Sequence, residues 1–250
     1  MIQLTIIKIT GYGHWTLTLG SDREHKLQML QSSLYNEIQN QFSEKNCLVF
    51  SNRFDELFAI TNGLSLDDHV KIQKKLAESF NIQLSMTIGY GDSPFEANLK
   101  ADEARKSKII LEKEHNIFGY VDGKADQLVQ IMHMDVDGST SISAKKSPYE
   151  ISSLMFKLYS EMSEFFLTKN SLTFFMGGDN FMIVTSGNGK EYAMKFLDSM
   201  KEKYDVALNC GIGTAKTARE AAKLATKSLD TIRELRDSGK NMQRVLEITC

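Results

Sequence analysis

Two carboxylates end the apolar segment IMHMDVDGST, residues 131–140. Asp135 and Asp137 are two residues apart, so on an extended strand both side chains point to the same side. Carboxylate oxygens in this arrangement suit Mg²⁺, which binds one or two carboxylates together with substrate phosphate oxygens. The backbone N–H groups of Gly138, Ser139 and Thr140 are suited to cradle those phosphates. The structural alternative is an ordinary turn at Asp137-Gly138 followed by a capping serine.

A second candidate is the segment FMGGDNF, residues 175–181, which lies between two β-type runs. Gly177, Gly178 and Asn180 would serve in an ordinary hairpin turn, because glycine and asparagine tolerate positive φ. If this hairpin lies beside the strand that ends at Asp135, Asp179 approaches that carboxylate, and the glycines leave room for a base or a phosphate. Two converging aspartates are typical of a paired metal site, in which one Mg²⁺ activates the attacking oxygen and another bridges phosphates.

These motifs lie in a duplicated chain. Phe50 and Phe174 are 124 residues apart, and identical residues recur at that spacing, without a gap, as far as Ala101 and Ala225. Each copy predicts strand, helix, hairpin, helix, strand and helix. The expected ranges are 2–10, 23–42, 47–61, 65–80, 82–90 and 93–110 in the first copy, and 129–137, 147–168, 171–185, 190–204, 206–213 and 217–236 in the second. This order predicts an α+β protein of two tandem ferredoxin-like βαββαβ domains with antiparallel sheets, 1–116 and 127–250, with a linker over 114–127.

Composition excludes several classes of protein. The chain has 250 residues, a net charge of −2 and a pI near 6.2, which disfavours a basic surface for a nucleic acid polymer. No run approaches the roughly 18 apolar residues of a membrane span, and the start, MIQLTIIKIT, lacks a signal-peptide layout. Cys47, Cys210 and Cys250 form no CxxC pair, which argues against a zinc knuckle or a disulfide framework. We expect a cytoplasmic protein with no membrane partner.

The strand acid, the Gly-Gly-Asp hairpin and the βαββαβ order resemble the palm-type domains of class III nucleotidyl cyclases and GGDEF diguanylate cyclases. KADEA at 100–104 and GKN at 239–241 resemble the closing part of a GGDEF domain. The tandem arrangement, with MIQ at 1–3, YGHWT at 12–16, RFD at 53–55 and ITNG at 60–63, is more similar to archaeal GTP cyclohydrolase III. This resemblance covers essentially the whole chain.

The resemblance implies a Mg²⁺-dependent hydrolase that acts on GTP. Its product would be 2-amino-5-formylamino-6-ribosylamino-4(3H)-pyrimidinone 5′-monophosphate, with the formyl group retained and phosphate released. Asp135 and Asp179 would be metal ligands, with the Val136 carbonyl as a third. His133 and Asp137 are candidates for activating the water that attacks the ring. The resemblance also implies a homo-oligomer, either a dimer or a tetramer.

The same resemblance assigns the substrate contacts. Gly138, Ser139 and Thr140 would meet phosphate oxygens, and the hairpin segment GGDN, residues 177–180, would admit the guanine. Arg53 could offer a fork of donors to a guanine edge or a phosphate, or it could be a surface arginine of its hairpin.

Two departures from the pattern limit these expectations. Asn180 stands where GGDEF enzymes carry a glutamate, which argues against cyclic-di-GMP synthesis. In the first copy, Thr10 is expected at the place of the strand acid, and Arg53-Phe54 replaces the two glycines. We therefore predict one working site per chain, in the second copy. A nucleotidyl cyclase and a non-catalytic nucleotide sensor remain alternatives.

Overall fold

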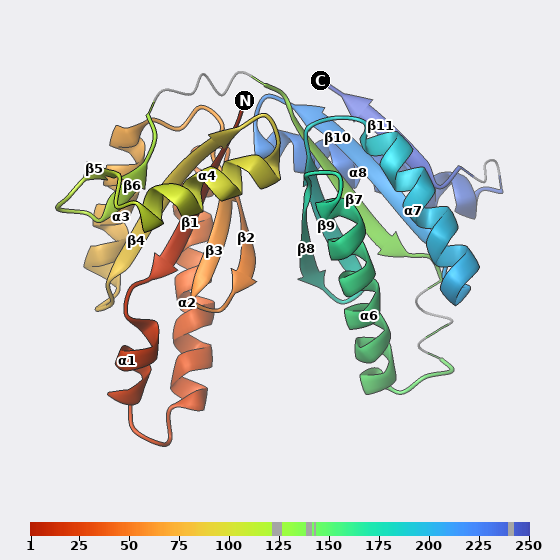
Figure 1. Cartoon of the computed structure of the whole chain (residues 1–250). Helices are drawn as coiled ribbons and strands as arrows, with labels where there is room; N and C mark the ends of the chain where they lie inside the picture. The colour runs from red at the N-terminus through yellow and green to blue at the C-terminus, as the bar shows by residue number, and fades with distance from the viewer. Residues whose placement is uncertain (122–126, 139–141, 143, 240–242) are drawn as a thin grey trace. The chain divides into compact units, whose positions relative to one another are not determined.

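The computed structural model describes residues 1–121, 127–138, 142, 144–239 and 243–250. The chain divides into two compact units, each drawn with its own sheet in Figure 1. The first unit comprises Met1–Asp92 and Glu96–Asp126, and the second comprises Ser93–Phe95 and Gln127–Cys250. No helix within the described ranges is both long and apolar enough to cross a bilayer.

The first unit contains a six-stranded sheet in the order β2-β3-β1-β4-β6-β5. The pairs β1–β3, β1–β4 and β2–β3 are antiparallel, and β6 joins β4 in parallel. The predicted linker begins too early, because β6 belongs to this sheet; a three-residue strand is too short to show a hydrophobic period. The elements are β1 (Ile2–Ile9), α1 (Tyr12–Leu17), α2 (Glu24–Ser43), β2 (Leu48–Arg53), β3 (Glu56–Ile60), α3 (Leu66–Ser79), β4 (Leu84–Gly91), α4 (Pro94–Lys106), β5 (Ile110–Glu112) and β6 (Ile117–Gly119).

The second unit repeats this plan with a five-stranded sheet in the order β11-β10-β7-β9-β8. Its central pairs are antiparallel, and β11 joins β10 in parallel. The predicted α+β, ferredoxin-like fold is therefore confirmed, and in each copy a helix and a parallel strand follow the βαββαβ core. The elements are β7 (Val129–Val136), α6 (Pro148–Leu167), β8 (Leu172–Gly177), β9 (Asn180–Thr185), α7 (Gly189–Tyr204), β10 (Leu208–Ala215), α8 (Ala218–Asp237) and β11 (Val245–Thr249).

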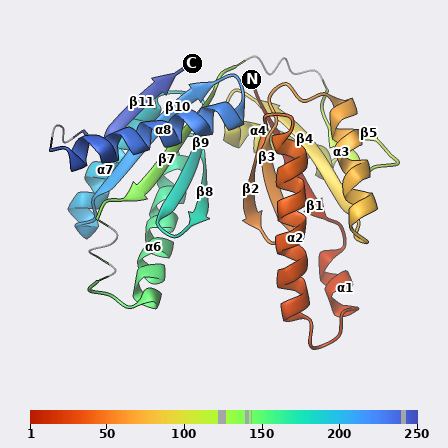
Figure 2. The same ribbon diagram turned by 180° about the vertical axis from the view of Figure 1, so that it is seen from behind.

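Helices cover both faces of the second sheet. Side chains of α6 and α7 form the main core with one face of the strands, and these helices lie in front in Figure 1. Figure 2 shows α8 in front of the opposite face. A Cβ on Gly213 would lie 2.0 Å from the Ala221 carbonyl oxygen, and one on Gly89 would lie 2.1 Å from that of Ala97. The glycines that recur in both copies therefore let a helix backbone approach its strand closely.

Candidate active site

The strand acid of the second unit lies in a row of polar side chains beneath α8. Asp135 is on the central strand β7, opposite Asn180 of β9 and Asn209 of β10. Cross-strand partners face the same side of a sheet, so these three side chains share one face. His133 precedes Asp135 by two residues and shares that face too. The row lies at the carboxyl end of β7, close to the chain segment that carries Asp137.

The carboxylate of Asp135 is buried and only partly satisfied. Its Oδ2 accepts two hydrogen bonds from Arg233 of α8, at 3.1 Å from Nε and 2.6 Å from Nη2. Its Oδ1 is buried and receives no hydrogen bond from any residue that the structure describes. Asn209 Nδ2 is likewise buried, and its amide points toward the Asp137 carboxylate, whose pKa it helps to lower. A buried polar atom without a partner is costly, so the unmatched acceptor of Asp135 fits a site for a cation.

Asp137 lies between two arginines. Arg236 of α8 donates through Nη1 to Oδ1, and Arg244 donates through Nη1 to Oδ2 at 3.1 Å. Burial opposes ionisation of Asp137, but the hydrogen bond from Arg236 and the charges of Arg236 and Arg244 outweigh it and lower the pKa. An ionised carboxylate between two guanidinium groups is a weak proton acceptor. This environment favours Asp137 as the group that holds the arginines and disfavours it as the base that activates water.

The hairpin brings Asp179 next to this row. Gly177 and Gly178, at its turn, have φ of 96° and 61°, a conformation that glycine adopts without steric cost. Asp179 follows them and is half-buried. Its Oδ1 accepts a hydrogen bond of 3.0 Å from the Nδ2 of Asn180, the residue opposite Asp135. Asp179 therefore lies in the turn directly before Asn180, the residue that pairs with Asp135.

His133 is half-buried on β7 and is held from both sides. Its Nδ1 lies 3.1 Å from Thr226 Oγ1 of α8, and its Nε2 lies 3.1 Å from Asn180 Oδ1. Burial lowers the pKa of His133, although the hydrogen bond with Asn180 and the charge of Asp135 act in the opposite direction. Both ring nitrogens therefore have protein partners.

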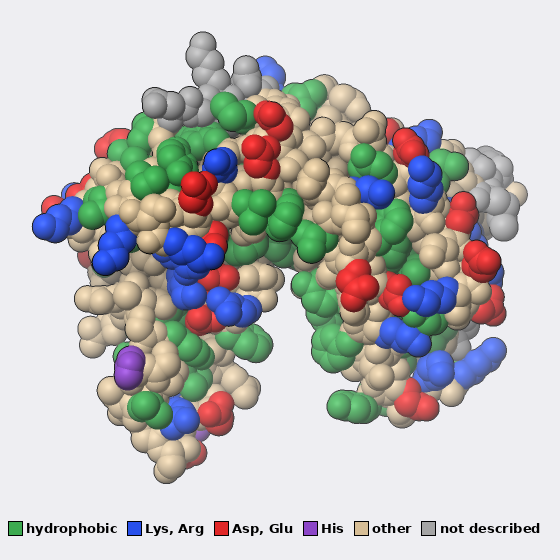
Figure 3. All heavy atoms as spheres, in the orientation of Figure 1, with side chains coloured by type: hydrophobic (Ala, Val, Ile, Leu, Met, Phe, Trp, Pro, Cys, Tyr) green, Lys and Arg blue, Asp and Glu red, His purple; other side chains and the backbone are tan. Residues whose placement is uncertain are grey.

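A cavity of about 420 Å³ lies beside the same hairpin, against α6. Phe156 and Phe175 meet edge to face there, with ring centroids 5.9 Å apart. Phe156 is 60% exposed, and Figure 3 shows hydrophobic side chains over the α6 and β8 part of this unit. An exposed aromatic wall beside a glycine turn suits a flat heterocycle. The lining residues are Ile151, Ser152, Met155, Phe156, Phe175, Gly178 and Asp179.

The first unit has a smaller cavity at the equivalent place. It measures about 190 Å³ and lies between α2 and the hairpin. Phe54 lines this cavity and occupies the repeat position of Gly178. The glycine turn of the second unit is therefore associated with the larger space.

The first copy carries a lysine where the second has Asp135. Lys8 lies opposite Glu56, and Asp135 lies opposite Asn180, which is the repeat equivalent of Glu56. The expectation that Thr10 takes the place of the acid was therefore wrong. The hairpins are 124 residues apart and these strands 127, because the first copy has three more residues between strand and hairpin. An alignment extended back from the hairpin misses this shift.

The Glu56 carboxylate forms ion pairs with three cationic side chains of the first unit. Its Oε2 lies 3.3 Å from Lys8 Nζ, 3.2 Å from Arg53 Nη2 and 3.8 Å from Arg105 Nη1. Arg53 also lies 3.7 Å from Asp55, so the guanidinium predicted to meet substrate is paired within its own hairpin. A lysine ammonium in this position repels a metal cation, whereas a carboxylate binds one.

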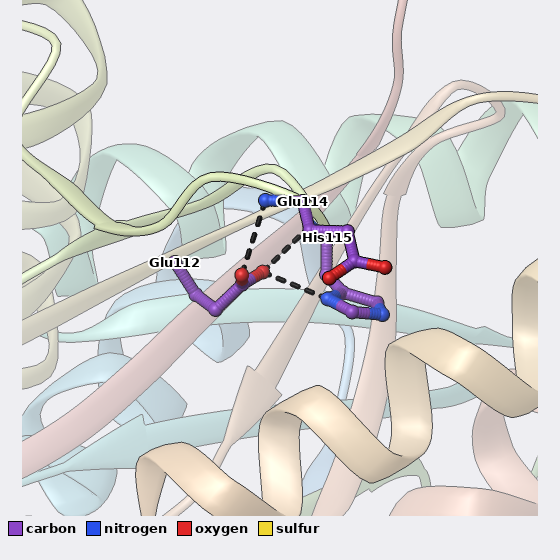
Figure 4. Close-up of side chains that lie close together, drawn as sticks. All are labelled: Glu112, Glu114 and His115. Atoms are coloured by element: carbon purple, nitrogen blue, oxygen red, sulfur yellow. Dashed lines mark hydrogen bonds and ion pairs between the residues drawn. The ribbon is translucent and has the colours of Figure 1, made fainter.

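A further cluster in the first unit could be considered for a metal. Glu112, Glu114 and His115 lie together at the turn between β5 and β6 (Figure 4). The Glu112 carboxylate accepts hydrogen bonds from the backbone N–H of Glu114 at 3.1 Å and of His115 at 2.6 Å, and contacts His115 Nδ1 at 2.8 Å. The Glu112 oxygens thus accept hydrogen bonds from the turn itself, so the cluster stabilises the turn between β5 and β6.

The remaining predicted positions divide into two groups. Val136 is buried at the end of β7, opposite Leu208, and Gly138 follows with φ of 68°. Ser139 and Thr140, the other predicted phosphate contacts, lie outside the described residues.

Sequence reasoning missed the three arginines that face the strand acids. Arg233 and Arg236 are three residues apart, a spacing that places them on one face of a helix. That periodic signal was present in the sequence. It did not show that this face lies against β7, or that Arg244, which follows α8, joins it.

The chain is similar to known proteins over nearly its whole length. A family model described as GTP cyclohydrolase III matches residues 1–246. The GTP cyclohydrolase III of Methanothermobacter thermautotrophicus is 36% identical over 237 residues, which cover 93% of this chain and 95% of the relative. That of Methanocaldococcus jannaschii is 36% identical over 245 residues, covering 93% and 88%. Among solved structures, the FimX GGDEF domain of Pseudomonas aeruginosa is similar, with a TM-score of 0.42 and 15% identity over 50% of this chain and 82% of that chain. On the whole-chain family match and these near full-length relatives, the chain belongs to the GTP cyclohydrolase III family.

Proposed function

We propose that the second unit hydrolyses GTP with the help of Mg²⁺. The reaction opens the imidazole ring, retains the formyl group and cleaves the triphosphate. The products are 2-amino-5-formylamino-6-ribosylamino-4(3H)-pyrimidinone 5′-monophosphate and phosphate. The observation that carries this proposal is the buried Asp135 carboxylate, which has one unsatisfied oxygen and lies under arginines of α8. Family membership supports GTP as the substrate.

The donor set around Asp135 fits a magnesium ion. Asp135 and Asp179 would hold it through carboxylate oxygens, with the Val136 backbone carbonyl as a third ligand. Bound there, Mg²⁺ would polarise phosphate oxygens and lower the pKa of a coordinated water. Arg233 now satisfies one oxygen of Asp135, so it stabilises the carboxylate before a cation arrives.

The triphosphate is bound by cations from α8 and the segment after it. Arg236 and Arg244 are each about two-fifths exposed and are aligned by Asp137. Planar guanidinium groups bind phosphate oxygens with paired donors, and a carboxylate behind them fixes their orientation. Gly138, Ser139 and Thr140 supply backbone N–H groups beside them.

The guanine lies in the cavity of the second hairpin. Phe156 and Phe175 stack on the flat base, and the absence of a side chain at Gly178 leaves room for it. The Asp179 oxygen that Asn180 does not use can accept from the N–H groups of a guanine edge when it is not binding metal. Arg53 can contribute to substrate binding only if its ion pair with Glu56 is broken.

One site works in each chain. In the first unit, Lys8 replaces the strand acid and Phe54 lines a smaller equivalent cavity, so neither metal nor base is accommodated. The assembly is a homo-oligomer, a dimer or tetramer, which native mass spectrometry measures directly.

Mass spectrometry of the products from GTP, with Mg²⁺ and in a metal-free control, tests the reaction. A formylaminopyrimidine monophosphate with free phosphate is expected. A cyclic nucleotide with pyrophosphate would make the protein a cyclase, and unchanged GTP would make it a nucleotide sensor. Asp179→Asn should abolish turnover while circular dichroism stays unchanged; a normal rate would remove Asp179 from the site.

A further inference from the structure

Three hydrogen bonds in series connect helix α8 to the hairpin acid of the second unit. Thr226 Oγ1 lies 3.1 Å from His133 Nδ1, and His133 Nε2 lies 3.1 Å from Asn180 Oδ1. Asn180 Nδ2 then donates to Asp179 Oδ1 at 3.0 Å. We call these four side chains the α8–hairpin relay. They come from α8, β7, β9 and the turn before β9, so the relay crosses two strands of the sheet.

The chemistry of the atoms determines the direction of the relay. An ionised carboxylate can only accept, so the amide nitrogen of Asn180 faces Asp179 and its oxygen faces His133. His133 Nε2 must therefore carry a proton and donate a hydrogen bond to that oxygen. His133 Nδ1 faces the Thr226 hydroxyl, which can donate to a ring nitrogen that carries no proton. In the neutral Nε2–H form, Nδ1 is an acceptor, so the Thr226 hydroxyl donates to it.

We propose that Thr226 is a positioning residue that, through His133 and Asn180, orients the Asp179 carboxylate for metal binding. The inference rests on the proposed function, in which Asp179 is a metal ligand. Partners that hold a ligand through a hydrogen bond determine its orientation and basicity. His133 also takes a different role from the one expected, because both its ring nitrogens are engaged. It orients Asn180 and does not exchange protons with the attacking water.

The first unit has no such relay. Ile6 stands at the position of His133, because it lies opposite Phe58 as His133 lies opposite Met182. Glu56 stands at the position of Asn180 and is engaged by Lys8. The relay therefore occurs in the unit that has the glycine hairpin and the strand acid, where an oriented Asp179 would be needed.

The experiment compares three variants of the full-length protein. Thr226→Val keeps the shape of the side chain and removes the donor, whereas Thr226→Ser keeps the hydroxyl. Thr231→Val is the matched control, because Thr231 is on the same helix and its hydroxyl donates to the Lys227 carbonyl of that helix. ¹⁵N NMR of the imidazole nitrogens reports the tautomer of His133, with its signals assigned by loss in His133→Gln. Mg²⁺ dependence of GTP turnover, and Mn²⁺ binding by electron paramagnetic resonance, report the metal site.

We expect the Nε2–H tautomer in the unmodified protein, in Thr226→Ser and in Thr231→Val. In Thr226→Val the proton should stay on Nε2, but Nδ1 loses its hydrogen bond, so its ¹⁵N signal should move toward that of an unbonded ring nitrogen. The concentrations of Mg²⁺ and Mn²⁺ needed for half-saturation should rise about tenfold. An Nδ1–H tautomer in the unmodified protein, or unchanged metal affinity in Thr226→Val, would overturn the inference. If the unmodified protein shows no GTP turnover, the proposed function fails, and the tautomer and Mn²⁺ measurements still decide the relay.

Discussion

Removing the arginine that faces the strand acid tests whether Asp135 is a cation site. Arg233→Met keeps the aliphatic part of the side chain and removes donors at 3.1 and 2.6 Å from Asp135 Oδ2. Leaving one charge of a buried pair unmatched costs roughly 3–5 kcal/mol. Because the Arg233 side chain is 38% exposed, water already screens part of the pair, and we expect a loss of roughly 2–3 kcal/mol in metal-free buffer. For a unit of this size, Tm should fall by roughly 6–12 °C.

Mg²⁺ should reverse part of that loss. A cation that binds the folded protein and not the unfolded chain adds stability that grows with its concentration. In Arg233→Met the Asp135 carboxylate no longer has a competing guanidinium, so Mg²⁺ should stabilise this variant more than the unmodified protein. The assay is urea denaturation in EDTA and across a MgCl₂ series, followed by circular dichroism.

Asp135→Asn is the control for this experiment. Its amide oxygen can still accept from Arg233, but it lacks the charge that a cation needs, so its midpoint should not respond to Mg²⁺ at Asp135. An equal response of Arg233→Met and Asp135→Asn to Mg²⁺, or none in either, would refute the cation site. A metal-free Arg233→Met as stable as the unmodified protein would refute the energetic argument.

Three further predictions concern the hairpins and a buried histidine. Lys8→Asp should not restore turnover to Asp135→Asn, because the cavity of the first hairpin, which Phe54 lines, stays small; measurable product from this double variant would contradict the single-site proposal. Gly178→Phe should raise KM for GTP more than tenfold by filling the cavity. Gly178→Ala carries the same positive-φ strain, and its Cβ would make only an ordinary contact, 3.8 Å from Asn180 Nδ2, so an equal effect in both would exclude a base there. Burial lowers the pKa of His69 to about 4, below the roughly 6.5 of an unfolded chain. The contribution of neutral His69 to the free energy of unfolding is therefore fully present above pH 6.5 and falls by about 3 kcal/mol toward pH 4. If a His69→Gln variant loses as much stability in acid in urea titrations, His69 is not the cause.

Local pattern predicted most of the fold. The capping box at Ser65 and the capping box at Ser147 with Pro148 at the first helical turn begin α3 and α6, near the predicted starts. Alternation predicted β7 over 129–137, and the strand ends at Val136. These features depend on neighbouring residues, so a single sequence reveals them. β6 was missed because three residues carry no measurable period.

The candidate site was predicted in part. Asp135, Asp179, Asn180 and His133 were named from strand ends and turn chemistry. The structure places Asp135 and His133 on β7, Asn180 opposite Asp135 on β9, and Asp179 in the turn before β9. Thr226 was not named, because a threonine within an amphipathic helix looks like many others. Its meeting with His133 depends on the rotation of α8 against the sheet.

By itself, the sequence determined the duplication, the order of strands and helices, and the acids at the ends of β7 and the hairpin. Those properties follow from side-chain periodicity and backbone preference, which act over a few residues. Only the tertiary structure decided that Arg233 faces Asp135. It also decided that the counterpart of Asp135 in the first copy is Lys8 and not Thr10. Strand register and helix rotation are set by packing between distant segments, and a shift of one residue turns a side chain to the other face.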